Sequence, residues 1–105
     1  MKPLVRRPPR YSFVTVVEVV DLHSETSLQG KTTDLSMFGC FVETWDPLPP
    51  ETKVRVKITS RGAQFVALGR VARVRPSAGM GITFTDIAPN DQQTLEEWIS
   101  QLRTS

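Results

Sequence analysis

The sequence has one cysteine, Cys40, and one histidine, His23, in 105 residues. A single cysteine cannot form an internal disulfide, which fits a reducing compartment. No second histidine and no cysteine cluster accompanies His23, so a metal site is not expected. These absences direct the search for function away from metal centres and disulfide scaffolds.

Long apolar runs are also missing. The longest apolar segment, Phe13 to Val20, is interrupted by Thr15 and Glu18 and is too short to span a bilayer. The basic N-terminus has no apolar run behind it and does not have the pattern of a signal peptide. No nucleophile elbow, glycine-rich phosphate loop or zinc motif occurs. We therefore expect a cytoplasmic protein that does not insert into a membrane and is not an enzyme.

Acidic residues are absent from two stretches. The first acid is Glu18, whereas the first ten residues include Lys2, Arg6, Arg7 and Arg10. The segment from residue 52 to residue 85 likewise contains several lysines and arginines but no acid. The net charge is only +2, yet this distribution indicates an anionic partner: a nucleotide, a nucleic acid or a membrane surface.

A chain of this length forms one small domain, and 39% apolar residues suffice for one core. The proline-rich residues 1–10 predict a flexible, extended arm. A polar loop is expected at residues 21–30. In the long predicted strand from residue 64 to residue 75 the alternation slips near Gly69, which indicates a bulge. Strands are predicted at residues 11–20, 31–34, 40–45, 53–58, 64–75 and 80–85.

The end of the chain has a helical period instead. Apolar residues recur with i, i+3, i+4, i+7 spacing from Leu95 to Leu102, and Asn90 with Gln93 resembles a capping box. A helix is therefore predicted from about residue 90 to about residue 102. Six short strands and one C-terminal helix predict an all-β fold over residues 11–105: a six-stranded antiparallel barrel closed at one side by the helix.

Two short motifs follow one another on this pattern. Arg6 and Arg10 have RxxxR spacing, and residues 34–39, Asp-Leu-Ser-Met-Phe-Gly, form a DxSxxG pattern. Each motif is common by chance, but the pair is much more specific. Together with the later segments 69–74 and 79–84, the pair resembles the PilZ family over nearly the whole chain. The resemblance implies a six-stranded split barrel with an appended helix, and a non-catalytic receptor for the bacterial second messenger cyclic di-GMP, with no cofactor.

The residue types suit that ligand, which has two phosphates and two guanines. An arginine fork matches a phosphate and also matches guanine O6 and N7, so Arg6 and Arg10, with Arg7 between them, are candidate contacts. The family resemblance implies that the arm wraps the ligand against the barrel. Val5 stands where many relatives have a further arginine that stacks on a base, and this slightly favours one bound ligand over an intercalated pair.

The turn motif supplies the complementary groups. The Asp34 carboxylate can accept the adjacent N1–H and N2–H₂ donors of a guanine, and Ser36 can add one hydrogen bond to base or phosphate. Gly39 permits φ > 0 or a close approach of backbone to ligand. The candidate site is therefore Arg6, Arg7, Arg10, Asp34, Ser36 and Gly39.

Simpler interpretations remain open for the same residues. The arginines of the arm suit a solvated basic tail, and residues 34–39 suit a plain turn. Arg70, Arg73 and Arg75 are expected on solvated strand faces, where charge blocks edge pairing, and contact of one of these cations with a ligand phosphate stays open. Cys40 is expected to be a small buried hydrophobe. For Trp45, core packing and contact with a partner are both open.

Two alternative functions remain. One is a PilZ-like interaction module that binds no nucleotide. The other is a small barrel that binds single-stranded nucleic acid, which needs exposed aromatic residues for base stacking; Phe65 and Tyr11 are the candidates, and nucleic acid is the less expected partner. No output domain is visible in the sequence, so we expect an unidentified downstream protein to receive the signal.

Overall fold

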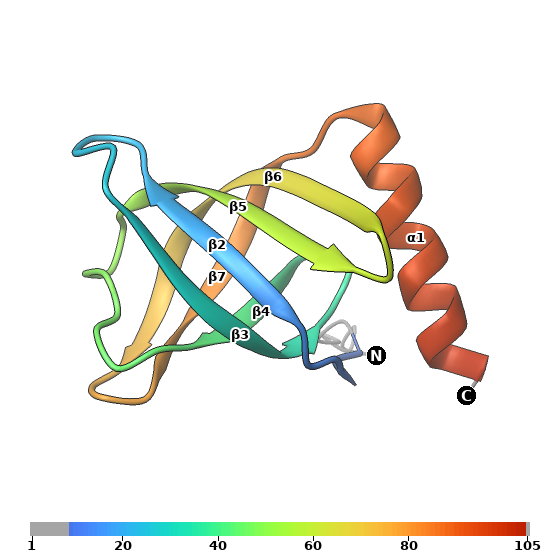
Figure 1. The fold of residues 1–105 in the computed structure, drawn as a ribbon, viewed down its shortest axis with the longest axis horizontal. Coiled ribbons are helices and arrows are strands. Elements are labelled where there is room, and N and C mark those ends of the chain that lie inside the picture. Colours follow the sequence, from blue (N-terminus) through green and yellow to red (C-terminus); the bar gives the residue numbers. More distant parts are fainter. Residues whose placement is uncertain (1–8, 105) are drawn as a thin grey trace, which may run out of the picture.

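The computed structural model describes residues 9–104. In this range the chain forms a β-barrel with a helix beside one end (Figure 1). The elements are β1 (Tyr11–Ser12), β2 (Val16–Asp21), β3 (Ser27–Leu35), β4 (Gly39–Glu43), β5 (Lys53–Ser60), β6 (Ala63–Arg75), β7 (Gly79–Asp86) and α1 (Pro89–Thr104).

The barrel closes because β3 pairs with two different neighbours along its length. Its first half pairs with β2 and its second half with β4, so the strand order β3-β2-β5-β6-β7-β4 returns to β3. All these pairings are antiparallel. The short β1 adds to the ring by pairing with the end of β3. The predicted fold, a six-stranded antiparallel barrel with a C-terminal helix, is confirmed.

The first predicted strand, residues 11–20, is in fact two strands. Between β1 and β2 the chain is held to β3 partly by a side chain: Thr32 Oγ1 accepts from the Thr15 N–H at 3.1 Å and donates to the Phe13 carbonyl oxygen at 2.5 Å. Thr32 is fully buried. Its hydroxyl thus forms hydrogen bonds with backbone groups that would otherwise pair with the backbone of β3. This interruption of the ladder separates β1 from β2.

The loop predicted at residues 21–30 is wrong for its second half. β3 begins at Ser27, and Leu28 and Gly30 lie opposite Val19 and Val17 of β2. The side chains of this part of β3 that face outward are polar, which gives it the composition of a loop. Gly30 allows a close approach of β3 to β4, because a Cβ there would lie 2.7 Å from the Glu43 carbonyl oxygen.

The core lies inside the barrel and follows the predicted alternation. Val54, Val56 and Ile58 of β5 are fully buried, whereas Lys53 and Arg55 are exposed. The predicted slip near Gly69 is confirmed as a register shift between Leu68 and Gly69 in the β6–β7 ladder. A tight turn at Arg61 and Gly62, both with positive φ, joins β5 to β6, as expected for a two-residue hairpin loop.

The helix α1 begins one residue earlier than predicted. The Ala88 carbonyl oxygen accepts the first helical hydrogen bond, from the Gln92 N–H at 2.8 Å, so Pro89 is the first helical residue, where its missing N–H costs nothing. The capping box expected at Asn90 and Gln93 is therefore wrong, because Asn90 lies inside the first turn. Asp91 reaches the barrel instead, and its carboxylate accepts a 2.9 Å hydrogen bond from the Val66 N–H of β6.

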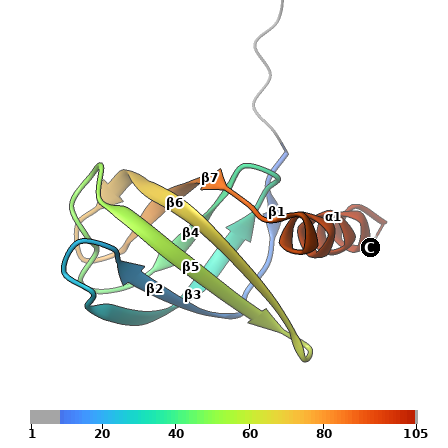
Figure 2. The same ribbon diagram turned by 90° about the horizontal axis from the view of Figure 1, so that it is seen from above.

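Aromatic rings join α1 to the barrel. Trp98, which is 8% exposed, lies 5.3 Å from the ring of Phe13 and 6.3 Å from that of Phe65, measured between centroids. Leu95 and Ile99 are buried on the same face of the helix. Seen from above, β1 lies beside α1 (Figure 2). The helix thus covers the barrel next to the point where the N-terminal segment joins it.

Candidate ligand-binding site

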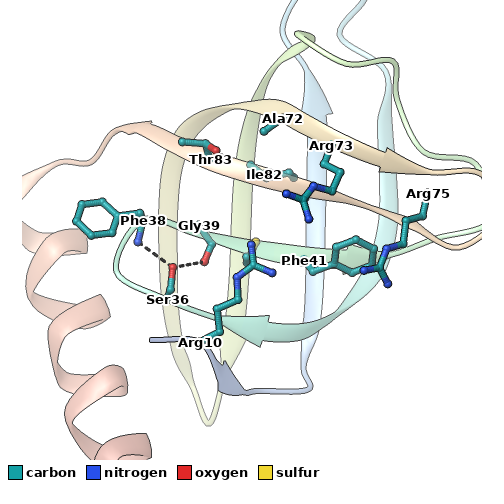
Figure 3. A pocket seen from close by; sticks show the side chains of 12 residues that line it. Arg10, Ser36, Phe38, Gly39, Phe41, Ala72, Arg73, Arg75, Ile82 and Thr83 are labelled. Atoms are coloured by element: carbon teal, nitrogen blue, oxygen red, sulfur yellow. Dashed lines mark hydrogen bonds between the residues drawn. The ribbon is translucent and has the colours of Figure 1, made fainter. Parts of the chain in front are cut away.

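The DxSxxG motif forms the tight connection between β3 and β4. The Ser36 N–H donates to the Gly39 carbonyl oxygen at 2.9 Å. The Phe38 N–H donates to Ser36 Oγ at 3.1 Å, and the Ser36 hydroxyl donates in turn to the Gly39 oxygen at 3.4 Å (Figure 3). On the other side, the Phe84 N–H of β7 donates to the Phe38 oxygen at 2.8 Å. Ser36 is 5% exposed, and its hydroxyl fixes the shape of the turn.

Gly39 is required by packing and not by its backbone angle. Its φ is not positive, which excludes one of the two reasons expected for a glycine here. A Cβ on Gly39 would lie 2.2 Å from the Ile82 carbonyl oxygen of β7. The close approach that the glycine permits is therefore between β4 and β7, directly beside the candidate site.

A cavity of about 320 Å³ opens on the outside of the barrel at this point. Its wall is formed by β4, β6 and β7, and the turn residues Ser36 and Gly39 line one end. Three arginines also line it: Arg10 from the segment before β1, and Arg73 and Arg75 from β6 (Figure 3). The volume is within the range of small-molecule sites.

The arginines of the cavity carry charge that no carboxylate neutralises within residues 9–104. The two ion pairs found there are Lys57–Glu18 and Arg70–Glu51, on other parts of the barrel. Arg75 instead lies over the Phe41 ring, 5.4 Å from its centroid. Unpaired guanidinium groups around one hollow attract an anion, and their planar forks suit phosphate or the O6/N7 edge of guanine.

The pairing of β1 with β3 brings Arg10 to the turn. Tyr11 lies opposite Leu35 and Ser12 opposite Asp34. Continued by one residue, this register places Arg10 beside Ser36. The two residue pairs of β1 and β3 therefore hold the C-terminal arginine of the RxxxR motif next to the DxSxxG turn.

Asp34 lies next to the cavity and does not line it. It is half-buried on β3, opposite Phe41 of β4, whose side chain is part of the cavity wall. The Thr33 hydroxyl is 3.5 Å from Asp34 Oδ2. Burial, and to a smaller extent the Asp34 charge, raises the pKa of the Cys40 thiol to about 12, and Cys40 is the buried hydrophobe that was expected.

The structure therefore brings together Arg10, Ser36 and Gly39, with Asp34 on the adjacent strand. Arg6 and Arg7 lie outside the described residues. The interpretation of Arg73 and Arg75 as solvated strand faces is incomplete, since both line the cavity. Their spacing of two on one predicted strand was the available signal, because such residues share a face.

Two other expectations are resolved by burial. Phe65, the proposed stacking residue of a nucleic-acid surface, has no exposed area and cannot meet a base; that prediction is wrong. Trp45, left open between core and surface, is 84% exposed. Among residues 9–104 no group of histidine, cysteine or acidic side chains could hold a metal ion, and no helix is long and apolar enough to cross a membrane.

Solved structures resemble this fold closely. The PilZ domain of CeSA from a cellulose-synthesising bacterium matches with a TM-score of 0.72 and 24% identity, over 90% of this chain and 98% of that one. The inhibitor of motility MotI/DgrA from Bacillus subtilis matches with a TM-score of 0.79 and 18% identity, over 97% and 53%. YcgR from Escherichia coli, in complex with c-di-GMP, matches with a TM-score of 0.78 and 16% identity, over 94% and 46%.

The chain thus spans about half the length of MotI/DgrA and of YcgR. At these identities the structural matches establish the fold. No curated protein sequence matches the chain. The sequence profile of the PilZ domain matches residues 4–101, which is nearly the whole chain. The chain belongs to the PilZ domain family.

Proposed function

We propose that the domain is a receptor for cyclic di-GMP, which it binds at the arginine-lined cavity. The observation that carries the proposal is the convergence of Arg10, Arg73 and Arg75 on one hollow beside the DxSxxG turn. A dianion with two purine bases complements such a hollow in charge, because guanidinium groups bind phosphate and the O6/N7 edge of guanine. The YcgR structure, which contains c-di-GMP, shows that a domain with this fold takes this ligand.

The arginines divide into fixed and arm residues. Arg73 and Arg75 stand on a continuous strand and form the fixed part of the site. Arg10 stands where the chain joins the barrel, and Arg6 and Arg7 precede it on the arm. We assign phosphate binding and guanine O6/N7 recognition to these side chains, because a guanidinium fork is suited to both.

The turn supplies acceptors for the other edge of guanine. Asp34 stands beside the cavity wall, and its carboxylate accepts N1–H and N2–H₂ of one base in the proposed complex. Ser36 already uses its proton within the turn, so its remaining lone pair takes a donor from the ligand. Gly39 lets the β4 backbone approach β7 closely beside the cavity.

The proposed signal is an ordering of the arm. Residues 1–10 close over the ligand when their arginines meet phosphate, and the altered surface is read by a protein partner. The arm is attached through β1, which pairs with β3 at Asp34 and lies beside α1. Ligand binding therefore acts next to both the turn motif and the helix.

Calorimetric titration of the pure chain with cyclic di-GMP tests this proposal. Arg6→Ala, Arg10→Ala and Asp34→Ala are each expected to weaken binding by at least ~1–3 kcal/mol, the worth of a charge-assisted contact. Arg55→Ala, on the outer face of β5 and outside the cavity, is the matched control and should bind normally.

The stoichiometry of the same titration decides between one ligand and an intercalated pair, and the Val5 position favours one. Absence of binding at high micromolar ligand would reject the receptor and leave the interaction module without nucleotide. A parallel gel-shift assay with single-stranded oligonucleotides at two salt concentrations covers the remaining alternative, since such binding falls steeply with salt.

A further inference from the structure

Trp45 is the most exposed large hydrophobic residue in the described part of the chain, at 84% of its surface. It stands at the start of the loop that joins β4 to β5. This loop lies at the end of the barrel opposite α1 (Figure 1). Tryptophan is seldom left this open on a small domain, and it is enriched in the central anchors of protein interfaces. An indole as exposed as that of Trp45 is therefore expected to contact a ligand or a protein partner.

The backbone that carries Trp45 is fixed on both sides. The Thr44 N–H donates to the Ala78 carbonyl oxygen of the β6–β7 turn at 3.0 Å, and the Asp46 N–H donates to Thr44 Oγ1 at 3.3 Å. Pro47 follows directly and restricts the chain further. The backbone at Trp45 is thus ordered in the absence of any partner, which lowers the entropic cost of binding at this position.

A hollow of about 640 Å³ lies against this indole, and we name it the Trp45 hollow. Glu43 and Asp46 line it, and both side chains are exposed. Neither carboxylate forms an ion pair within residues 9–104. Lys31, which lies opposite Glu43 in the β3–β4 ladder, also lines the hollow. With two carboxylates and one ammonium group, the lining of the hollow has a net negative charge.

A hollow lined by an indole and two carboxylates suits a cationic side chain. A guanidinium or ammonium group stacks on the electron-rich ring and is neutralised by the acids at its edge. An anionic group would meet Glu43 and Asp46, and a purely apolar one would desolvate them without compensation. The cavity with Arg73 and Arg75, by contrast, repels a cation. The two surfaces therefore select partners of opposite charge.

From these observations we propose that the Trp45 hollow docks a protein partner that inserts an arginine or lysine side chain between the indole and the two carboxylates. The hollow stands at the end of β4 and the arginine-lined cavity at its beginning. A partner can therefore occupy the hollow while the cavity is filled. This docking site stands independently of cyclic di-GMP binding.

Selection from a random peptide display library tests the proposal without knowledge of the natural partner. Immobilised wild-type chain is the target, and Trp45→Ala chain, which loses only a surface side chain, is used for counter-selection. We expect the surviving peptides to share an arginine or lysine at a fixed position. Survivors that are acidic or purely apolar, or no Trp45-dependent survivor at all, would overturn the proposal.

The strongest peptide is then titrated into ¹⁵N-labelled protein. We expect the Trp45 indole N–H resonance to shift, and the affinity to fall at least tenfold for Trp45→Ala, for the pair Glu43→Gln with Asp46→Asn, and for a peptide whose cation is replaced by methionine. Val14→Ala, at another exposed apolar position, should bind normally. Sedimentation analysis completes the test: a dimer that forms in wild type and disappears in Trp45→Ala would show that the occupant is a second copy and not a cationic partner.

Discussion

The guanidinium of Arg75 lies over the ring of Phe41, 5.4 Å from its centroid, and both side chains line the cavity. The two residues come from β6 and β4, which are not neighbours in the ring of strands, since β7 runs between them. At this distance the cation is attracted electrostatically by the face of the ring. The contact favours a position of the Arg75 guanidinium over the cavity wall before any ligand arrives.

This arrangement predicts a graded response to substitution at residue 75. Arg75→Ala should weaken cyclic di-GMP binding by about 1–3 kcal/mol, the worth of a charge-assisted contact, and Arg73→Ala should have a similar effect. Arg75→Lys keeps the charge but loses the planar fork, so its affinity should be intermediate. Calorimetry measures all three.

Arg70→Ala is the control for these variants, because Arg70 stands on the same strand but pairs with Glu51 outside the cavity. Its affinity should equal that of wild type. Equal losses for Arg70→Ala and Arg75→Ala would mean that the strand contributes only general positive charge and no defined contact.

Gly39→Ala is expected to destabilise the fold as well as the site. The added Cβ would lie 2.2 Å from the Ile82 oxygen, so β4 and β7 must separate, at a cost of about 1–3 kcal/mol by analogy with overpacked cores. Urea unfolding followed by circular dichroism measures the change. At Gly81, also on the cavity wall, the nearest atom to an added Cβ is 3.7 Å away, and Gly81→Ala should unfold at nearly the wild-type midpoint.

The two tryptophans should differ sharply in their contribution to stability. Trp98→Ala removes a buried ring that contacts Phe13 and Phe65, and should cost about 3–5 kcal/mol. Trp45→Ala removes an exposed ring and should change stability by less than about 0.5 kcal/mol. Thermal unfolding of both variants gives the comparison, and a large loss in Trp45→Ala would show that its loop supports the barrel.

The buried thiol of Cys40 gives the fold a dependence on alkaline pH. Its pKa is raised from an ordinary 9.0 to about 12, so the folded protein keeps a proton that the unfolded chain releases. Stability contributed by this group therefore falls as pH rises above about 9, and by pH 10 the loss approaches about 1.4 kcal/mol.

Urea unfolding at pH 7.5 and pH 10, with reductant present, measures this effect. The decrease between the two values should be smaller in Cys40→Ala than in wild type by about that amount. The comparison between variants removes every contribution to the pH dependence that does not come from Cys40. Equal decreases would show that the thiol ionises in the folded state.

Regular patterns in the sequence predicted most of the fold. The alternation from Lys53 to Ile58 and the helical stripe from Leu95 to Leu102 each imply one buried face, and both are found. The first half of β3 was missed because its outward side chains are polar and Gly30 faces inward. Its strand character comes from pairing with β2, and no property of the segment alone reveals that.

The candidate site was predicted only in part for a similar reason. Asp34, Ser36 and Gly39 are close in sequence and form a recognisable motif, whereas Arg73 and Arg75 reach the same place through the β4–β7–β6 ladders. Only the register of three strands brings them to Phe41. Gly39 shows the same limit, because its nearest neighbour, Ile82, belongs to a strand that begins forty residues later.

The contact between Phe13 and Trp98 has a thermodynamic consequence for any protein that grips α1. Phe13 lies directly after the strand that pairs with Asp34, so the helix and the arm share one packed junction. Equilibrium coupling through such a junction is reciprocal. A partner whose hold on α1 becomes tighter when the arm closes must raise the affinity for the nucleotide by the same factor. Measured alone, the domain would then understate how strongly it binds within a complex.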